Sequence, residues 1–579
     1  MRNFLKTMLA VICGFALITM IFVFIVLGIL GTSMSTPSVS IKPNSIFVIE
    51  LNGTVQERSN DLSNYTSLFN SNDVKYIGLD DILDAIATAS TDNNIKGIYL
   101  KCGVLSAPPA SISEIRDALI RFKETGKFIT AYADNYSQSA YQIASLADKV
   151  YMNPEGILQI TGYHIQTIFF KDLLEKVGVE MQVVKVGTYK SAVEPYILNK
   201  MSDANREQNF EMAKSLWNKF LLEVSNSRKI NTEKINEFAD KGITFSEAIQ
   251  SVNYGLIDSL VYELDVDALL AQKMECEEDD LQFCSLKDVK NLQKNIDYQK
   301  NKIAVVYASG AIDSGNNNEE NIDSEKLSAT LRSIAKDENI KAVVLRVNSP
   351  GGSAFGSEQI WYALNKVKAN KPLIVSMGGY AASGGYYISC IADTIVAQPN
   401  TITGSIGIFG LIPNAQGLVN KLGLSFDGVK TNEMSNFGEL FRPMSEQERS
   451  LVQGKVNRGY ELFVKRCADG RSMSIDAIKS IAEGRVWTGE QALENGLVDT
   501  LGNLNDALAI AIEKSGVEEY EVVSYPEKKD LLTQILEEFS SSQMQIHSLT
   551  NYSKYINYFD GLINGNAVQA RMPYFLVIK

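Results

Sequence analysis

Runs of apolar residues alternate with amphipathic segments along most of this chain. In its second half, residues 340–348 (IKAVVLRVN) and 372–378 (PLIVSMG) are mostly apolar and predict buried strands. Residues 357–370 and 382–393 predict helices, and residues 394–398 predict a further strand. This order of elements indicates βαβ units around a mainly parallel sheet, so the predicted fold class is α/β.

The same pattern occurs twice. Residues 91–101 (TDNNIKGIYLK) align with residues 336–346 (KDENIKAVVLR) at an offset of 245 positions. The offset also holds for later identities, among them Pro154 with Pro399 and Gly178 with Gly423. A constant offset over such a length predicts two copies of one domain in tandem, each built from repeated βαβ units.

The N-terminal segment is apolar enough to cross a membrane. Leu9 to Gly31 contains no charged residue and would span roughly 34 Å as a helix, enough for the hydrocarbon core of a bilayer. Arg2 and Lys6 precede it, and positive charge stays on the cytoplasmic side, so the body of the chain is expected outside the cytoplasm. A cleaved signal peptide is the competing interpretation, but its apolar region usually has only about 7–15 residues. We therefore expect one uncleaved transmembrane helix.

These patterns divide the chain into five parts. The acidic stretch ECEEDD at 275–280 and the polar residues after it are typical of a connection between domains. The predicted parts are an anchor with its linker (1–40), a first domain (41–275), a connection (276–300), a second domain (301–525) and a C-terminal extension (526–579).

Composition narrows the classes of function. The formal net charge is -13 and the pI is near 5.0, which argues against nucleic acid as the main partner because phosphate contacts need a basic face. The only two histidines, His164 and His547, belong to no zinc-protease motif, and the six cysteines show no CxxC spacing. No cofactor or metal site is predicted.

Two glycine-rich segments follow predicted strands. NSPGGS (348–353) and GYAASGGYY (379–387) lie just past strand C-termini, where open α/β sheets place their functional sites. Ser383 stands at a strand-to-helix junction and is the candidate nucleophile. Gly352 and Gly384 are candidate N–H donors to an oxyanion, because glycine lets the backbone approach a substrate carbonyl. Close packing of small residues is the alternative interpretation.

A serine nucleophile needs a base, and no motif supplies a histidine for it. A neutral lysine can take this role. A free lysine has a pKa of about 10.4, so roughly one in 2,500 is neutral near pH 7, but burial lowers the pKa. Lys190, in VVKVGTYKSAVEPY (183–196), follows an apolar strand and is flanked by small residues. It is one candidate among 55 Lys and Arg residues, most of which are expected to be solvated.

Together the motifs resemble a known family. NSPGG, MGGYAASGGYYIS, TGSIGIFG and GTYKSAVEPY, in tandem behind an apolar N-terminus, are similar to long-form bacterial signal peptide peptidase A (protease IV) over nearly the whole chain. The resemblance implies tandem domains of the ClpP/crotonase-like fold and a homotetramer on the outer face of the cytoplasmic membrane. By position it implies these roles: Ser383 as nucleophile, Lys190 as general base, Gly352 and Gly384 at the oxyanion positions, and Ser405 as a serine that hydrogen-bonds the lysine.

The repeat and the candidate dyad fit one another. At the offset of 245 positions, Ser383 corresponds to Gln138, and Lys190 corresponds to Ser435. The first copy thus has the lysine without the serine, and the second has the serine without the lysine. We expect the copies to pack side by side so that each supplies half of one dyad, either within one chain or between two chains.

The predicted function is a membrane-anchored serine endopeptidase that degrades signal peptides and other apolar-rich peptides. Expected partners are peptide substrates, the membrane and further copies of the chain, without nucleic acid. The expected location is the bacterial inner membrane, with a single pass and the catalytic body on the periplasmic side. Two alternatives stay open: a non-enzymatic, membrane-anchored scaffold of the same fold, and a crotonase-type acyl-thioester enzyme, against which the anchor argues.

Overall fold

The computed structural model describes most of the chain after its N-terminal segment. The described residues are 40–59, 75–292, 299–313, 321–528, the backbone of 568–571 and six isolated positions between 8 and 21. The predicted anchor and linker, residues 1–40, lie almost wholly outside them. Within the described ranges, no helix is both long and apolar enough to span a bilayer.

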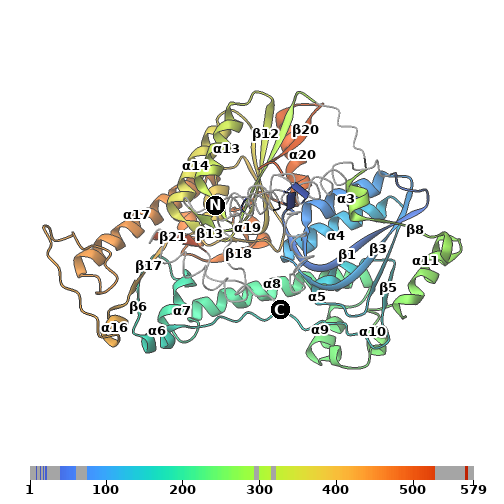
Figure 1. Ribbon diagram of the computed structural model, residues 1–579, viewed down its shortest axis with the longest axis horizontal. Helices are drawn as coiled ribbons and strands as arrows, with labels where there is room; N and C mark the ends of the chain where they lie inside the picture. Colours follow the sequence, from blue (N-terminus) through green and yellow to red (C-terminus); the bar gives the residue numbers. More distant parts are fainter. Residues whose placement is uncertain are drawn as a thin grey trace.

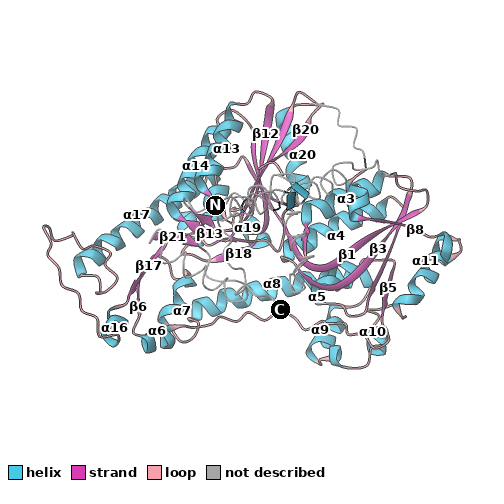
Figure 2. Ribbon diagram, viewed as in Figure 1, coloured by secondary structure: helices cyan, strands magenta, loops and turns pink. Residues whose placement is uncertain are grey.

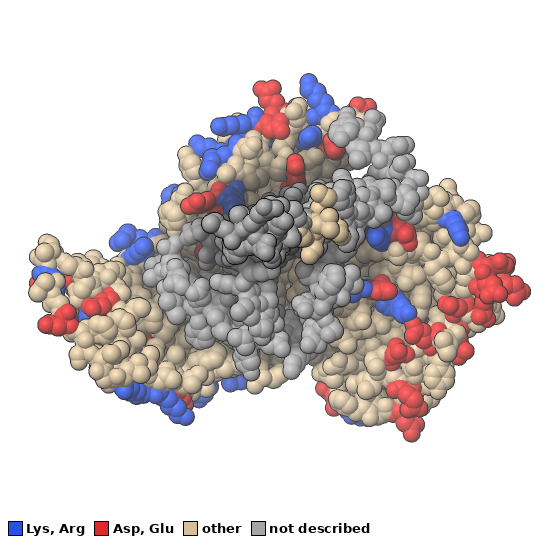
Figure 3. Space-filling view, in the orientation of Figure 1, with Lys and Arg blue, Asp and Glu red and all other residues tan. Residues whose placement is uncertain are grey.

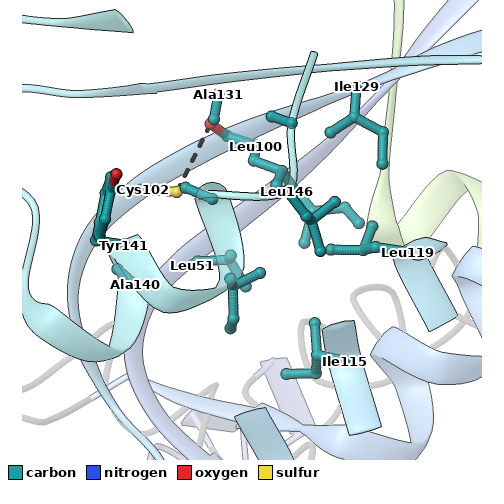
Figure 4. Close-up of a cluster of buried hydrophobic side chains, with 14 of the residues drawn as sticks. Leu51, Leu100, Cys102, Ile115, Leu119, Ile129, Ala131, Ala140, Tyr141 and Leu146 are labelled. Atoms are coloured by element: carbon teal, nitrogen blue, oxygen red, sulfur yellow. Dashed lines mark hydrogen bonds between the residues drawn. The ribbon is translucent and has the colours of Figure 1, made fainter. Parts of the chain in front are cut away.

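The first repeat forms a seven-stranded parallel sheet in the order β2-β1-β3-β4-β5-β7, with β8 paired to β1. Most of its buried apolar residues pack against helices on one face of the sheet, and a smaller apolar cluster covers part of the other face. Figure 4 shows part of this core, where Leu51, Leu100 and Ile129 come from strands and Ile115 and Leu119 from helix α4. The strands are β1 (Ser45–Gln56), β2 (Tyr76–Gly78), β3 (Ile95–Ser106), β4 (Phe128–Ala133), β5 (Lys149–Met152), β7 (Ser259–Leu260) and β8 (Gln282–Ser285). The helices are α3 (Leu79–Thr91), α4 (Pro109–Glu124), α5 (Gln138–Ala144), α9 (Thr232–Asp240), α10 (Ile249–Asn253), α11 (Val266–Met274) and α12 (Leu286–Lys290).

The second repeat forms an eight-stranded sheet with the path β18-β16-β14-β12-β9-β20, to which β15 and β19 are added beside β14. Alternate residues of β9 point to opposite sides: Ala304 packs with the core under α13 and α14, and Ile303 packs with α20. Figure 2 shows these helices on either side of the sheet. The strands are β9 (Lys302–Ser309), β12 (Ile340–Ser349), β14 (Leu373–Ala382), β15 (Thr394–Ala397), β16 (Ile402–Gly404), β18 (Val486–Thr488), β19 (Thr500–Leu501) and β20 (Glu521–Tyr525). The helices are α13 (Ser324–Lys336), α14 (Ala354–Lys368), α15 (Gly384–Ser389), α18 (Ile475–Ile481), α19 (Gly489–Glu494) and α20 (Leu504–Ser515).

Equivalent elements recur at the predicted spacing, which confirms the two-copy organisation. Helix α3 begins at Leu79 and α13 at Ser324, an offset of 245 positions. The same offset separates the start of α4, at Pro109, from the start of α14, at Ala354. The long helices α8 (Asp203–Arg228) and α17 (Glu446–Arg471) also correspond, and each has 26 residues.

A third sheet joins the two repeats. Its order is β11-β10-β13-β21-β17-β6, and β6, from the first repeat, runs antiparallel to β17, from the second. Figure 1 shows β6, α6 and α7 of the first repeat beside α16 and α17 of the second, while α8 runs back toward α9 and α10. The first repeat therefore extends an arm into the second. The bounds are β6 (Glu180–Lys185), β10 (Ile312–Asp313), β11 (Ile322–Asp323), β13 (Gly351–Ser353), β17 (Phe409–Asn414), β21 (Val568–Arg571), α6 (Lys171–Val177), α7 (Glu194–Ile197) and α16 (Gln416–Lys421).

Buried charges also join the repeats. Arg346 of β12 is fully buried and donates to Glu57 at 2.8 Å and to Glu114 of α4 at 2.6 Å. Burial raises the pKa of Glu114 to about 7, against the attraction of Arg346. Arg346 lies on the strand that leads to the glycine pair of β13, so this cluster connects the first repeat to a predicted part of the site.

The predicted connection at 276–300 is wrong in part. Strand β8 pairs with β1, and α12 packs against α3, so the first unit continues well beyond residue 275. The acidic stretch is an exposed turn within that unit, and it contributes to the negative patch near α11 in Figure 3. Its composition indicated a linker because both linkers and exposed turns are polar.

Two further boundaries differ from the sequence-based ones. The strand predicted at 372–378 continues to Ala382, because Tyr380 to Ala382 pair with β16. The helix predicted at 382–393 is shorter, since α15 begins only after Ser383. Within the predicted C-terminal extension, residues 568–571 form β21 of the third sheet, while residues 529–567 and 572–579 lie outside the described residues.

Candidate active site

Ser383 occupies a strained turn between β14 and α15. Its φ of 54° and ψ of -114° lie where residues other than glycine rarely occur. The turn is held on both sides, because the Ser383 N–H donates to the Gly404 carbonyl and the Ser383 carbonyl accepts from Tyr387 N–H, both at 2.8 Å. The turn thus holds a buried serine hydroxyl at the carboxyl edge of the sheet and the start of a helix.

Lys190 reaches this serine from the first repeat of the same chain. Its Nζ lies 2.8 Å from Ser383 Oγ, and 3.0 Å from both the Oγ and the carbonyl oxygen of Ser405. The lysine is 0% exposed, and burial lowers its pKa well below the ordinary value. The contact between the two half-sites that the repeat predicted is therefore present, and it is intramolecular.

The three contacts of Lys190 match a neutral amine. A neutral lysine amine has two hydrogens and one lone pair. The hydrogens can donate to the two oxygens of Ser405, which leaves the lone pair to accept the hydroxyl hydrogen of Ser383. This is the arrangement of a base hydrogen-bonded to the nucleophile that it activates.

The lysine loop is carried into the second repeat by strand pairing. Strand β6 pairs with β17 from Glu180↔Asn414 to Lys185↔Phe409, and the Tyr189 N–H then donates to the Glu483 carbonyl at 3.0 Å. A glycine makes room at the end of this path: a Cβ on Gly484 would lie 2.7 Å from the Lys190 nitrogen. The conformation of the loop thus depends on backbone contacts between the repeats.

Ser405 follows β16 and faces the lysine with two oxygens. It has a φ of 52°, is fully buried, and its N–H donates to the Arg485 carbonyl at 2.7 Å. The resemblance implied the hydroxyl contact with Lys190, and the structure contains it. The carbonyl contact is additional, and no sequence motif indicated it.

The two candidate oxyanion glycines lie on neighbouring elements. A Cβ on Gly352, in β13, would lie 2.1 Å from the carbonyl oxygen of Ile312, so only glycine fits there. Gly384 is the first residue of α15, where a backbone N–H has no acceptor within its own helix. Helix α15 packs against β13, so both glycines border the turn of Ser383.

The equivalent positions of the first repeat lack this chemistry. Gln138, at the place of Ser383, accepts hydrogen bonds from the N–H groups of Thr161 and Gly162 at 3.0 Å and so closes a loop. Ser435, at the place of Lys190, is exposed in a turn after α16. Among the described residues, the chain therefore has one Ser-Lys pair of this geometry.

A buried amide beside the dyad was not predicted. Gln208 of α8 donates to the Tyr189 carbonyl at 3.2 Å and to Ser191 Oγ at 2.9 Å, on either side of Lys190. One signal existed in the sequence, because polar residues occupy the buried face of α8 where the helical pattern calls for apolar ones. The residues of that face include Asn205, Gln208, Asn209, Met212 and Leu216.

Comparison with known proteins gives a consistent result. The model of peptidase family S49 matches residues 121–277 and 365–518, one segment in each repeat. The Clp protease model matches residues 293–402, at the start of the second repeat. The matches to the two models agree with an α/β, ClpP-like fold that is present twice.

Several curated proteases are similar over most of the chain. Protease 4 from Haemophilus influenzae is 38% identical over 442 residues, which cover 74% of this chain and 71% of the relative. Protease 4 from Salmonella typhi is 36% identical over 470 residues, 80% of this chain and 76% of the relative. The chloroplastic serine protease SPPA from Arabidopsis thaliana is 29% identical over 486 residues, 82% of this chain and 70% of the relative.

Proposed function

We propose that this chain, which belongs to peptidase family S49 and is a serine protease, is an endopeptidase that cleaves signal peptides and other apolar-rich peptides with a Ser383–Lys190 dyad. One observation carries the proposal: the Lys190 amine lies 2.8 Å from the Ser383 hydroxyl in a site where both residues are fully buried. A buried lysine with a lowered pKa can act as a base near neutral pH.

The geometry supports a two-step mechanism. Neutral Lys190 takes the hydroxyl proton of Ser383 while the oxygen attacks the peptide carbonyl. The N–H groups of Gly352 and Gly384 stabilise the oxyanion, and Lys190 then gives its proton to the leaving amine. A water molecule, activated by the same lysine, hydrolyses the acyl-enzyme. Ser405 accepts hydrogen bonds from the lysine with two oxygens and so stabilises the ammonium between the steps.

An extended peptide backbone fits between β13 and β17. The backbone of β21 lies there and runs antiparallel to both strands, with Gln569 paired to Ser353 on one side and to Phe409 on the other. Ala570 pairs with Gly352, one of the candidate oxyanion residues. A substrate in the same place adds a strand to the sheet and presents its carbonyl groups beside Ser383. This supports unfolded peptides, rather than folded proteins, as substrates.

The membrane setting is part of the proposal. Leu9 to Gly31 anchors the chain in the inner membrane, Arg2 and Lys6 keep the N-terminus inside, and four copies assemble on the outer face. Alkaline carbonate should fail to extract the protein, external protease should digest its body in spheroplasts, and light scattering in detergent should give the mass of four copies. Extraction by carbonate would contradict the anchor, and protection from the protease would contradict the outward-facing body. A monomeric mass would contradict the assembly of four copies.

The dyad is tested with the full-length chain in detergent micelles and a synthetic peptide that has a signal-sequence-like apolar core. Ser383→Ala and Lys190→Ala should each lower the cleavage rate by at least about 1,000-fold, because nucleophile and base act as a unit. Two matched controls should retain activity: Ser389→Ala, a buried serine of the helix that follows Ser383, and Lys185→Ala, a lysine of the strand that precedes the Lys190 loop.

Each contrary outcome has a definite meaning. Full activity of Lys190→Ala would show that the base is wrongly assigned. An inert but folded wild-type chain would favour a scaffold, and hydrolysis of an acyl-CoA thioester in place of the peptide would favour a crotonase-type enzyme. Equal cleavage of a charged peptide of the same length would contradict the preference for apolar substrates.

A further inference from the structure

A buried side chain outside the proposed dyad contacts both halves of the candidate site. Gln208 lies on α8 of the first repeat and is 2% exposed. Its Nε2 donates to the Tyr189 carbonyl at 3.2 Å and to Ser191 Oγ at 2.9 Å. These two residues flank Lys190, so the amide holds the chain on both sides of the lysine.

The other end of the same amide contacts the second repeat. Its Oε1 accepts from the Val486 N–H at 3.3 Å, and Val486 pairs with Gly404 in β16. The Gly404 carbonyl in turn accepts the N–H of Ser383, and Ser405 is the next residue along the chain. Gln208 is therefore linked to the lysine loop at one end and to the strand that precedes Ser405 at the other.

Neighbouring polar groups determine which way the amide points. Asn205 Oδ1 is a third acceptor near the two hydrogens of Gln208 Nε2, at 3.2 Å, and Asn205 Nδ2 donates to Glu194 at 2.8 Å. A flipped amide would place its NH₂ against the Val486 N–H and its oxygen against the Tyr189 carbonyl, two repulsive contacts. The network therefore selects one orientation, in which donor and acceptor each face a different half of the site.

General packing does not account for an amide at this position. A buried amide is costly unless both of its ends are hydrogen-bonded, and Met212 and Leu216 on the same face of α8 show that apolar side chains fit there. The equivalent residue of the second repeat, Gln453 on α17, is partly exposed and donates to Asn457 on its own helix and to the Lys185 carbonyl. It offers a matched control.

We propose that Gln208 is a positioning residue that sets the Lys190 amine against Ser383 across the junction of the two repeats. The proposal rests on the function proposed above, in which Lys190 is the base. Gln208 acts through the backbone around the lysine, so its loss misplaces the amine and opens the loop to water. Water favours the ammonium form and raises the pKa of Lys190 toward its ordinary value.

The test compares Gln208→Met, Gln208→Glu and the control Gln453→Met, all in the full-length chain. Methionine has a similar volume and makes none of the hydrogen bonds, while glutamate keeps an acceptor for Val486 N–H but turns a second oxygen toward the Tyr189 carbonyl. Both Gln208 variants should lower kcat on the apolar peptide by about 10- to 100-fold with KM nearly unchanged, because small displacements of a catalytic group are costly. The acid limb of the kcat profile should move to higher pH, and Gln453→Met should behave as wild type.

Two results would overturn the proposal. One is an unchanged kcat in both variants, with the rate of Ser383 labelling by a fluorophosphonate also unchanged. The other is a lower kcat with an unmoved pH profile, which is what a purely structural role produces. If Gln208→Met does not fold, the same measurements on Gln208→Glu decide. Failure of the proposed function is recognised separately, by activity of Ser383→Ala or Lys190→Ala.

Discussion

Replacing Lys190 by methionine should stabilise the fold while abolishing activity. Burial lowers the pKa of Lys190, so folding releases a proton that the unfolded chain binds. This release costs free energy wherever the pH is below the ordinary lysine pKa of about 10.4. Methionine has a similar length and no proton to lose, so Lys190→Met removes the cost.

The size of the effect follows from proton linkage. Between the pKa of Lys190 in the fold and about pH 10.4, the unfolded state binds one more proton than the folded state, so the stability of the lysine form rises with pH. The slope for one proton is about 1.36 kcal/mol per pH unit. The extra stability of Lys190→Met over the lysine form should therefore decrease by about 1.36 kcal/mol for each unit by which the pH rises. The methionine variant also loses the hydrogen bonds to Ser383 and Ser405, which lowers its gain in stability by an amount that does not depend on pH. The prediction is therefore tested by how the gain in stability changes with pH, not by its size at one pH.

The measurement is urea unfolding of Lys190→Met and Ser383→Ala, which retains the lysine. Both variants are expected to be inactive, so self-cleavage does not interfere. Between about pH 7.5 and about pH 9, the difference in their free energies of unfolding should shrink by about 2 kcal/mol. A difference that stays constant over this range would mean that the buried lysine keeps its proton, and its role as a general base would be refuted.

Three further substitutions test other parts of the structure. Ser405→Ala removes a hydrogen-bond acceptor of the ammonium that forms when Lys190 takes the proton, and should lower kcat by about 10- to 100-fold. The lost oxygen favours the charged form of Lys190, so the acid limb of the pH profile of kcat should move to lower pH. Ser389→Ala is the control, and an unchanged pH profile of Ser405→Ala would contradict the reasoning. Arg346→Met leaves Glu57 and Glu114 buried without a counter-charge and should lower the free energy of unfolding, measured in urea, by about 3–5 kcal/mol. A loss below about 1 kcal/mol would show that this charged cluster contributes little to the stability of the fold. Gln569→Pro removes a backbone N–H from β21 and so weakens its pairing with β13 and β17. Because β21 lies in the place proposed for the substrate, this change should lower KM for peptides. A raised KM would show instead that β21 helps to form the substrate groove.

The fold was predictable wherever its signals are local. Strands such as β12 are buried on both faces and so are apolar almost throughout. Because the domain is repeated, many of its elements could also be recognised twice in the sequence. The domain boundary at 275 failed because β8 joins β1 through backbone hydrogen bonds, which require no particular side chains. The start of α15 was misplaced because the φ of Ser383 is a property of the folded turn, held by neighbouring strands.

The residues of the candidate site also differ in how far the sequence alone could predict them. Ser383 and the glycines follow strand ends, so general rules for parallel sheets place them. Lys190 has only a weak local signal, an apolar strand before it and small residues around it, so the resemblance and the complementary repeats were needed to single it out among 55 basic residues. The buried polar face of α8 was a signal for Gln208, but it did not identify the contacts of this residue, because one of its partners lies 278 positions away, across the junction of the repeats.

The division of the proposed dyad between the two repeats also sets the earliest point at which the peptidase can acquire activity during its own synthesis. Ser383 is translated 193 residues after Lys190, an interval of about 10–40 s at about 5–20 residues per second. Strand β18, which pairs with the strand before Ser405, is made later still. The growing chain therefore contains Lys190, the proposed base, before it contains Ser383, and the proposed dyad stays incomplete until the second repeat has been made and has folded.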